Sequence, residues 1–208
     1  MILSGPEAAA TTVIEHVAAR FDNGRVALAI SWQKESAVLL DLVTRLAPDA
    51  RVFTLDTGAL FPETYAAWRA AEERYGITVE SWRGEWVDGL WAVDPQRCCF
   101  MRKVEPLKRA LAGADCWVTG LRREQSPQRA ATPEVAWDEV HGLFKAAPLA
   151  TWSEQDVWRY IAAHDVAYNA LHDRGYASIG CTHCTAPGRG REGRWADREM
   201  SECGMHGR

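Results

Sequence analysis

The sequence predicts an α/β protein built on a parallel β-sheet with helices on both faces, followed by a C-terminal tail that carries a cysteine. Short apolar runs typical of buried strands occur at residues 25–31, 51–55 and 77–82, and amphipathic helical patterns lie between them. This βαβαβ alternation predicts parallel strands joined by covering helices. With 208 residues, 47% of them hydrophobic, the chain can bury one full core. We expect a single domain, with a core at residues 1–195 and a mobile tail at residues 196–208.

Composition and charge limit the partners. The formal net charge of −4 argues against a general nucleic-acid-binding protein, which is usually basic. The N-terminal residues show no basic segment followed by an apolar run, and no apolar stretch approaches the length of a membrane span. We expect a cytoplasmic protein with neither nucleic acid nor membrane as a partner. In a reducing compartment, six cysteines indicate metal binding or catalysis rather than disulfides.

The first elements place a polar turn where a ligand could bind. Residues 6–21 have helical spacing, and Pro6 suits a first helical turn. The strand at 25–31 ends at Ser31, and a helix with apolar spacing runs on to Leu46. Strand, polar turn and helix together can hold a phosphate against backbone amides. The turn at residues 31–36 has no glycine, so it is neither a Walker loop nor a dinucleotide fingerprint. An ordinary connecting turn explains this stretch equally well.

The second strand, at residues 51–55, is followed by Asp56, Thr57 and Gly58, before a helix at 62–75 and a third strand at 77–82. In parallel sheets, ligands bind at the carboxyl ends of the strands. Ser31, Asp56, Thr57 and Gly58 are therefore candidate substrate-binding residues. Asp56 could accept hydrogen bonds from a ribose or a ligand amine, and a role as a helix cap or turn residue is equally consistent.

Four cysteines form two pairs with the composition of a cluster site. Cys98 and Cys99 are adjacent, and Cys181 and Cys184 form a CxxC pair. Adjacent cysteines alone indicate buried thiols, a vicinal disulfide or two cluster ligands, but the four thiolates together are a full set for a [4Fe-4S] cluster. Zinc sites usually show two spaced pairs, which adjacent cysteines fit poorly. If the segment is helical, Lys103 faces the same way as Cys99, where it could offset cluster charge and reach an anionic substrate, or be a solvated charge.

The remaining elements complete the sheet. The run at residues 114–120 predicts a strand with Cys116 in the core, and the basic loop at 121–129 lies at its carboxyl end. Such a loop suits phosphate or sulfate, although solvated charge runs are common. Residues 134–145 predict a short hairpin. Ser153 begins a helix with a capping-box pattern that runs to about residue 164.

These residues resemble a known family, the assimilatory sulfonucleotide reductases, which have the adenine nucleotide alpha hydrolase-like fold. The resemblance extends from Ser31 to His206 and is closest to the iron–sulfur branch, the adenylyl-sulfate (APS) reductases. Its motifs are Leu55-Asp56-Thr57-Gly58 with Pro62-Glu63-Thr64, Cys98-Cys99 with Arg102-Lys103-Val104, Gly120-Leu121-Arg122-Arg123 with Gln125-Ser126, Gly175-Tyr176 with Ser178-Ile179-Gly180-Cys181, Arg191-Glu192-Gly193-Arg194-Trp195, and Glu202-Cys203-Gly204-Met205-His206. The turn at residues 31–36 departs from the glycine-containing loops of related pyrophosphatases, which leaves the nucleotide contacts open.

The resemblance implies an activity and a set of roles. It implies that Cys203 is the catalytic cysteine, with His206 beside it, and that Cys98, Cys99, Cys181 and Cys184 bind a [4Fe-4S] cluster. The implied reaction of sulfate assimilation converts APS to sulfite and AMP through an S-sulfocysteine on Cys203. Arg191 and Arg194 match a family motif, and with Arg129 and Lys103 they are the expected anion contacts. Thiolate formation at Cys203 needs cations nearby, so the arginines and His206 favour it and Glu202 opposes it.

The intermediate needs a second thiol. With four cysteines assigned to the cluster and Cys116 in the core, none remains to resolve the intermediate, so an external reductant is expected; the resemblance implies thioredoxin or a glutaredoxin-like protein. A PAPS reductase with the same chemistry is the nearest alternative, because family members without the four cysteines use the 3′-phosphorylated substrate. A cluster-containing tRNA thiolation enzyme and a non-catalytic redox sensor are further alternatives. The sequence leaves the oligomeric state open, a homo-oligomer included.

Overall fold

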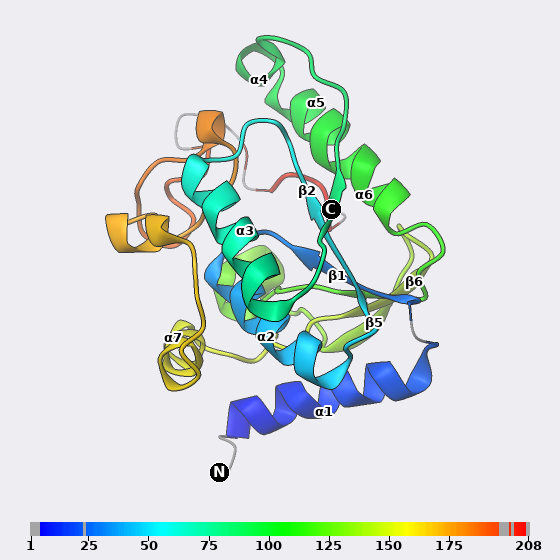
Figure 1. Ribbon diagram of the computed structural model, residues 1–208. Helices are drawn as coiled ribbons and strands as arrows, with labels where there is room; N and C mark the ends of the chain where they lie inside the picture. The colour runs from blue at the N-terminus through cyan, green and yellow to red at the C-terminus, as the bar shows by residue number, and fades with distance from the viewer. Residues whose placement is uncertain (1–4, 23, 196–199, 201, 207–208) are drawn as a thin grey trace.

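The computed structural model describes residues 5–22, 24–195, 200 and 202–206. Its centre is a six-stranded sheet in the order β3-β2-β1-β4-β6-β5 (Figure 1). Every pair of neighbouring strands is parallel except β5 and β6, which form an antiparallel hairpin. The strands are β1 (Val26–Ile30), β2 (Arg51–Leu55), β3 (Glu80–Trp82), β4 (Cys116–Val118), β5 (Val135–Asp138) and β6 (Leu143–Ala146).

Helices connect the strands and cover the sheet. They are α1 (Gly5–Arg20), α2 (Lys34–Leu46), α3 (Pro62–Tyr75), α4 (Leu90–Val93), α5 (Pro95–Cys99), α6 (Glu105–Ala110) and α7 (Glu154–Ala163). A π-helical turn, η1 (Phe100–Val104), joins α5 to α6, and short 3₁₀ turns occur at η2 (Arg123–Gln125), η3 (Pro127–Arg129), η4 (Ala170–Arg174) and η5 (Thr182–Cys184). Among the described residues, no helix has the length and apolar character needed to cross a bilayer.

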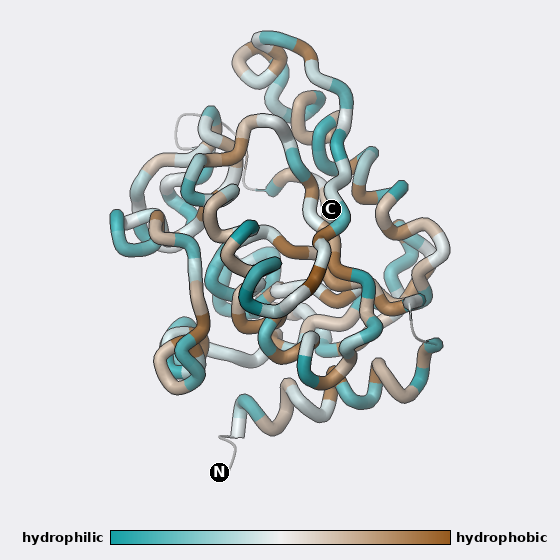
Figure 2. Tube along the Cα trace, viewed as in Figure 1, coloured by the Kyte–Doolittle hydropathy of each residue, from teal (hydrophilic) through white to brown (hydrophobic). Residues whose placement is uncertain are grey.

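The alternation of side chains along the strands divides the core into two layers. Val26, Leu28 and Ile30 face the layer that packs against α1, α2 and α7, whereas Ala27 faces the opposite layer, with Leu107 of α6. This alternation follows from the two-residue period of a strand. Figure 2 shows the hydrophobic segments concentrated in the central strands, with hydrophilic segments toward the outside. Helices therefore cover both faces, as the sequence predicts.

The segment from α5 to α6 is one continuous run of helix with a wide turn in its middle. The Glu105 amide donates to the Phe100 carbonyl, five residues back, which defines the π-helical geometry. Pro106 follows immediately, and a proline supplies no amide and clashes with the carbonyl four residues earlier. The wide turn relieves that clash, and such turns occur frequently at functional sites. Sequence periodicity does not predict it.

The elements agree with the sequence predictions except in their limits. The third strand is shorter than residues 77–82 because the Val79 amide donates to Glu72 Oε1 of α3, at 2.8 Å, instead of to the sheet. The predicted hairpin exists, and its second strand also pairs in parallel with β4. Of the predicted tail at residues 196–208, positions 196–199, 201 and 207–208 lie outside the described residues.

Candidate active site

A cavity of about 150 Å³ lies where the strand order reverses. The chain passes from β1 to β2 on one side and later returns to β4 on the other, and ligands bind at such a switch point. The predicted site residues that line this cavity are Ser31, Thr57, Lys103, Arg129, Cys181, Arg191, Arg194, Cys203 and His206. Asp56, Gly58, Cys98, Cys99 and Cys184 lie outside its lining.

The turn after β1 has an unusual backbone at Trp32. Its φ is +60°, in the left-handed region that side chains rarely adopt. The indole holds this conformation, because its Nε1 donates to Thr54 Oγ1 at 2.8 Å and the ring stacks on Trp68. A buried tryptophan thus occupies a backbone conformation that glycine adopts without strain, which accounts for a turn without glycines. Residues in sparsely populated backbone conformations such as this one often occur at functional sites.

The same turn is tied to the segment before Cys181. Gln33 Oε1 accepts hydrogen bonds from the Ile179 amide at 2.9 Å and from Ser178 Oγ at 3.2 Å. Two residues further, Glu35 lines the cavity and pairs with the buried Arg122 at 2.9 Å. Lys34 instead donates to the Ala177 carbonyl and pairs with Glu154, so its ammonium is outside the cavity lining.

Asp56 is occupied by protein groups. Its carboxylate accepts hydrogen bonds from the Gly58 amide and the Tyr65 hydroxyl and pairs with Arg83. Burial alone would raise the pKa of Asp56, but these hydrogen bonds outweigh it and lower the pKa. The carboxylate therefore fixes the turn after β2, and the structure gives it no position against the cavity. Its substrate role stays a prediction.

The four paired cysteines come from two segments, the end of α5 and the turn η5 with the residue before it. Cys98 and Cys99 end α5 and are buried, Cys181 is buried before η5, and Cys184 ends that turn. Burial raises the pKa of Cys99 to about 12, and the thiols of Cys203, Cys181 and Cys184 act on it in the same direction. None of the six cysteines forms a disulfide.

The donor chemistry of the four paired cysteines fits an iron–sulfur cluster. In the described part of the chain, no three His, Cys, Asp or Glu side chains converge as a single metal ion requires. The cysteines of a [4Fe-4S] cluster each bind a different iron, so their sulfurs surround a larger group. Buried donors also remain without partners in the described structure beside these cysteines: Arg102 Nη2 and Trp195 Nε1. The Trp195 amide donates to the Cys184 carbonyl at 3.1 Å, which places the backbone of Trp195 beside this cysteine.

Three buried cations surround Cys181. Lys103, Arg102 and Arg194 all act to lower the pKa of this thiol, and so does a hydrogen bond with Thr57; together they outweigh its burial. The neighbouring thiols of Cys181, Cys203 and Cys99 in turn raise the pKa of Lys103 to about 12 against the opposing effect of burial. No carboxylate in the described ranges pairs with any of the three cations. Buried cations are costly without anions, so the four thiolates and an anionic ligand fit this position.

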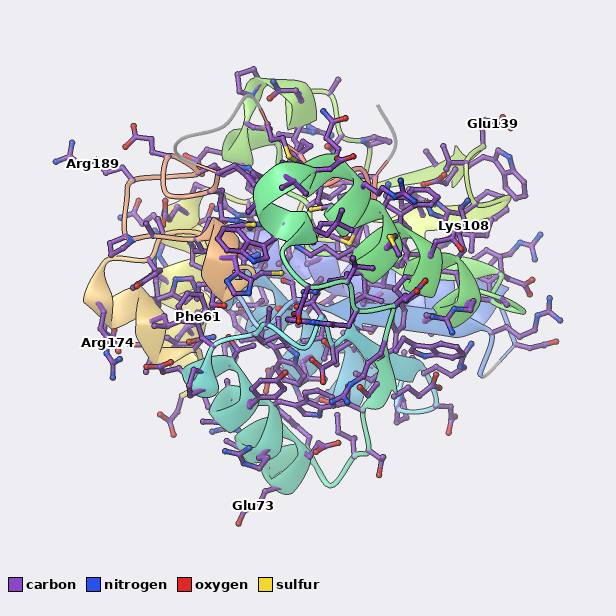
Figure 3. All side chains as sticks on the ribbon, turned by 90° about the horizontal axis from the view of Figure 1, so that it is seen from above. Phe61, Glu73, Lys108, Glu139, Arg174 and Arg189 are labelled. Carbon is purple, nitrogen blue, oxygen red and sulfur yellow. The ribbon has the colours of Figure 1, made fainter. Side chains whose placement is uncertain are left out.

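Arg194 is held by a close backbone approach. Its Nη1 donates to the Ile179 carbonyl at 3.2 Å, and its guanidinium lies against Gly180. A Cβ at position 180 would lie 2.5 Å from Arg194 Nη2, so any larger residue here would have to displace the buried guanidinium. By contrast, Arg189 in the same arginine-rich segment is exposed and points outward (Figure 3). The resemblance singles out Arg194 as an anion contact and gives Arg189 no role.

Arg129 and Arg191 form a pair of guanidinium groups that share one carboxylate. Glu202 accepts two hydrogen bonds from Arg129, at 2.9 Å and 2.8 Å, and one from Arg191, at 3.2 Å. Burial and the charge of Arg129 lower the pKa of Arg191 to about 10. Two guanidiniums held this close repel each other, so they form a site for an anion, and here Glu202 occupies it.

The described part of the tail lies inside the site. Gly204 has a φ of +84°, and Met205 beyond it packs on the same apolar layer as Leu107. The His206 ring stacks on Trp117 at 5.0 Å. Burial, with Lys145 and Arg129, holds the pKa of His206 well below 6.5, so the ring is neutral in this conformation. The red segment in Figure 1 follows this path below α5 and α6.

Comparisons with known proteins identify the family of the chain. Residues 25–187 match the model of the phosphoadenosine phosphosulfate reductase domain. The chain belongs to this family. An adenosine 5′-phosphosulfate reductase of Bacillus pumilus is 45% identical over 86% of this chain and 82% of its own length. A protein of the same name from Salinibacter ruber is 42% identical over 81% and 73%. The crystal structure of the PAPS reductase from Candida auris, a phosphate complex, superposes with a TM-score of 0.77, at 27% identity, over 89% of this chain and 99% of that chain.

Within this family's fold, the adenine nucleotide alpha hydrolase-like fold, the structure adds residues that the sequence did not mark. Arg102, Glu35 and Gln33 take part in the site through burial and long-range contacts, and Glu202 occupies the arginine pair. Arg102 was part of a motif without a role, and Glu202 was expected only to oppose thiolate formation. Their contacts with residues far along the chain would have identified them, and such contacts are not encoded in local sequence.

Proposed function

We propose that this protein is the thioredoxin-dependent adenylyl-sulfate reductase of sulfate assimilation, which converts APS to sulfite and AMP. One observation carries the proposal: a single cysteine outside the paired set, Cys203, reaches the cavity at the sheet's switch point together with four cations. Those cations are Lys103, Arg129, Arg191 and Arg194. The family of the chain and the names of its relatives support the same substrate class.

The first step forms a covalent intermediate. The Cys203 thiolate attacks the sulfur of the APS sulfate group, and an S–S bond forms. The bond from that sulfur to the bridging oxygen breaks, and AMP leaves with the electron pair. AMP is a good leaving group, so the protein mainly aligns the groups and balances charge. Lys103 interacts with both Cys203 and the cluster cysteines, which supports a role in stabilising the thiolate.

The second step releases sulfite. A thiolate of the reductant attacks the Cys203 sulfur of the S-sulfocysteine, and sulfite leaves with the electron pair. The second thiol of the reductant then breaks the mixed disulfide and returns Cys203 as a thiol, so the reductant supplies two electrons and becomes a disulfide. The only other cysteine outside the two pairs, Cys116, is fully buried in β4, which supports an external dithiol protein such as thioredoxin.

The cavity walls suggest how the substrate is held. Guanidinium groups bind sulfate and phosphate oxygens in pairs, which suits Arg129, Arg191 and Arg194 to the phosphosulfate. The nucleotide would lie toward Ser31 and Thr57, at the carboxyl ends of β1 and β2. The described cavity is smaller than a nucleotide site, for which roughly 300 Å³ is a lower limit. The tail residues Met205 and His206 occupy part of this space, so substrate binding requires the tail to move.

Cys98, Cys99, Cys181 and Cys184 would hold a [4Fe-4S] cluster. When bound, it would supply negative charge and a rigid connection between the segments that carry its cysteines. Arg102 and Trp195 would donate to it through the nitrogens that lack partners in the described residues. The Lys103 ammonium interacts electrostatically both with cysteines of this set and with Cys203, so a charge on the cluster would also affect the Cys203 thiolate through Lys103.

APS, rather than PAPS, is the substrate that the chain's features favour. The named bacterial relatives are APS reductases, and the four cysteines are present. The charged side chain that the turn at 31–36 contributes to the cavity is Glu35, an acid, while Lys34 is directed away. A 3′-phosphate would therefore gain no cation from this wall.

Steady-state assays with both nucleotides test the proposal. Purified without oxygen and supplied with thioredoxin, the protein should release sulfite from APS with a much higher kcat/KM than from PAPS, and should contain iron. A higher kcat/KM for PAPS would contradict the substrate assignment. Sulfite release that depends on ATP and tRNA would contradict the reaction class.

A further inference from the structure

We propose that Glu202 is an internal competitor of the substrate: its carboxylate occupies the sulfate subsite formed by Arg129 and Arg191, and the incoming sulfate must displace it before Cys203 can react. This inference rests on the proposed function and adds to it the control of tail opening. It assigns to Glu202 a role as a positioning residue, since it acts through the arginines and the tail.

The contact geometry is that of an anion in its subsite. The two oxygens of Glu202 accept in parallel from Nε and Nη2 of Arg129, and Oε2 also accepts from Arg191. A sulfate presents two oxygens to a guanidinium in the same way. The side chains of Arg129 and Arg191 are only 13% and 19% exposed, so this is a partly desolvated site rather than a surface pair.

An anion beside Arg129 and Arg191 offsets the repulsion between their two positive charges. Mutual repulsion and burial lower the pKa of Arg191, and the charge of Glu202 opposes that shift. Without Glu202, Arg129 would lose the carboxylate that accepts two of its hydrogen bonds, in a partly buried position where losing an ion-pair partner is costly. Glu202 removes this cost when substrate is absent, and substrate sulfate removes it when substrate is bound.

The position of Glu202 in the chain couples this exchange to the nucleophile. Glu202 immediately precedes Cys203, and Gly204 follows with a left-handed turn that seats Met205 on the sheet. Displacement of the carboxylate removes one of the contacts that hold residues 202–206 in the site, while Met205 and His206 keep theirs. After substrate has entered, the tail can close again with Cys203 toward the sulfur, since sulfate now excludes Glu202 from the arginines.

Amide hydrogen exchange of the C-terminal peptide tests this exchange without requiring turnover. In Glu202→Gln, which keeps the shape and loses the charge, the peptide should exchange roughly three- to tenfold faster than in the wild-type protein. Inorganic sulfate should accelerate exchange in the wild-type protein, relative to chloride at equal ionic strength, and should not do so in Glu202→Gln. The matched control is Glu73→Gln, which removes the same charge from an exposed position of α3 far from the tail (Figure 3). It should behave as the wild type.

Equal exchange in Glu202→Gln and the wild type, or the same sulfate effect in both, would overturn the inference. Binding measurements give a second test: Glu202→Gln should bind APS several-fold more tightly, whereas its affinity for AMP, which lacks sulfate, should be unchanged. Weaker APS binding would show that Glu202 assists the substrate and would also overturn it. If the wild type makes no sulfite from APS, the proposed function fails, while the exchange experiment with sulfate still reports on Glu202.

Discussion

Cys203 differs from the other five cysteines in its surroundings. Four are paired by sequence and gathered beside α5 and η5, and Cys116 is fully buried in β4. Cys203 is partly exposed and lies on the tail, in a cavity with several cations. At the scale of single residues, the account therefore depends on this thiol as the nucleophile.

Cys203→Ser should abolish sulfite release, because a hydroxyl is a far weaker nucleophile than a thiolate. The other thiol in the cavity lining, Cys181, is one of the four cysteines proposed to hold the cluster. The same variant should keep its iron content and its visible absorbance, since the four paired cysteines are intact. The control is Cys116→Ala, which removes a thiol from the core and should retain sulfite release. Activity in Cys203→Ser, or loss of the cluster in it, would contradict the assignment.

Arg129→Gln tests the sulfate subsite. Loss of a charged bidentate contact of about 1.5–3 kcal/mol should raise KM for APS by roughly 10- to 100-fold. The effect on kcat should be smaller if the contact is made in the bound substrate as well as in the transition state. The control is Arg123→Gln in the same basic loop, because Arg123 is exposed and donates to the Thr132 carbonyl instead. An equal rise in KM in both variants would indicate a general effect of charge.

His206 should make the seating of the tail dependent on pH. Seated, its pKa lies well below 6.5 because of burial and the cations Lys145 and Arg129; released, it returns to about 6.5. The released tail therefore binds more protons below pH 6.5, and seating should weaken there by up to about tenfold per pH unit while staying constant above pH 7.5. Exchange of the C-terminal peptide, corrected for intrinsic rates, should show this rise. His206→Phe, which keeps a ring on Trp117, should lose it; the same slope in both proteins would exclude His206 as the cause.

The sequence predicted many residues of the candidate site, but not which of their side chains contact one another. The cysteine pairs, Lys103 and the arginines were recognisable from spacing and motifs, and nine of the predicted residues line one cavity. The pairing of Arg129 with Glu202 joins positions 73 residues apart, which no local pattern encodes. Asp56 shows a second limit of sequence analysis. A carboxylate at the end of a strand can either stabilise a turn or bind a ligand, and only its hydrogen-bond partners in the structure distinguish the two roles.

At the scale of elements, the run from α5 through η1 to α6 brings Cys98, Cys99 and Lys103 to one place beside the cavity. Regular helical spacing predicts that Cys99 and Lys103 share a face, and their interaction is present. Helical spacing in the sequence does not predict the wide π-helical turn between them, because that turn depends on Pro106 and on packing. The strands and helices themselves follow their apolar patterns closely, because each buries one face against the sheet.

The loop before η5 gives a prediction at this scale. Gly180→Ala would place a Cβ 2.5 Å from the buried guanidinium of Arg194, which cannot withdraw without losing its bonds to the loop. We expect a loss of stability of about 1–3 kcal/mol and a lower iron content after anaerobic purification, because Cys181 is the next residue. Gly5→Ala in α1 is the control, since no atom lies within 4 Å of the added Cβ. Equal melting temperatures for the two variants would contradict the proposed contact.

At the scale of the whole molecule, a parallel sheet gathers chemistry from distant segments at one edge. The carboxyl ends of β1, β2 and β4 supply the cavity floor, the α5–α6 run and η5 supply cysteines and cations, and the tail supplies the nucleophile. The order of these segments and the fold class follow from the sequence. The position of residues 202–206 in the site does not follow from the sequence. It depends on the contacts that Glu202, Met205 and His206 make with residues far away in the chain.

Mass spectrometry of the tail tests the central claim most directly. Trypsin should release residues 199–208, a peptide in which Cys203 is the only cysteine. After anaerobic mixing with APS and no reductant, this peptide should gain the mass of one SO₃ group, and added thioredoxin should remove it with release of sulfite. An unmodified peptide from protein that nevertheless converts APS to sulfite, or the same group on another cysteine, would contradict the account.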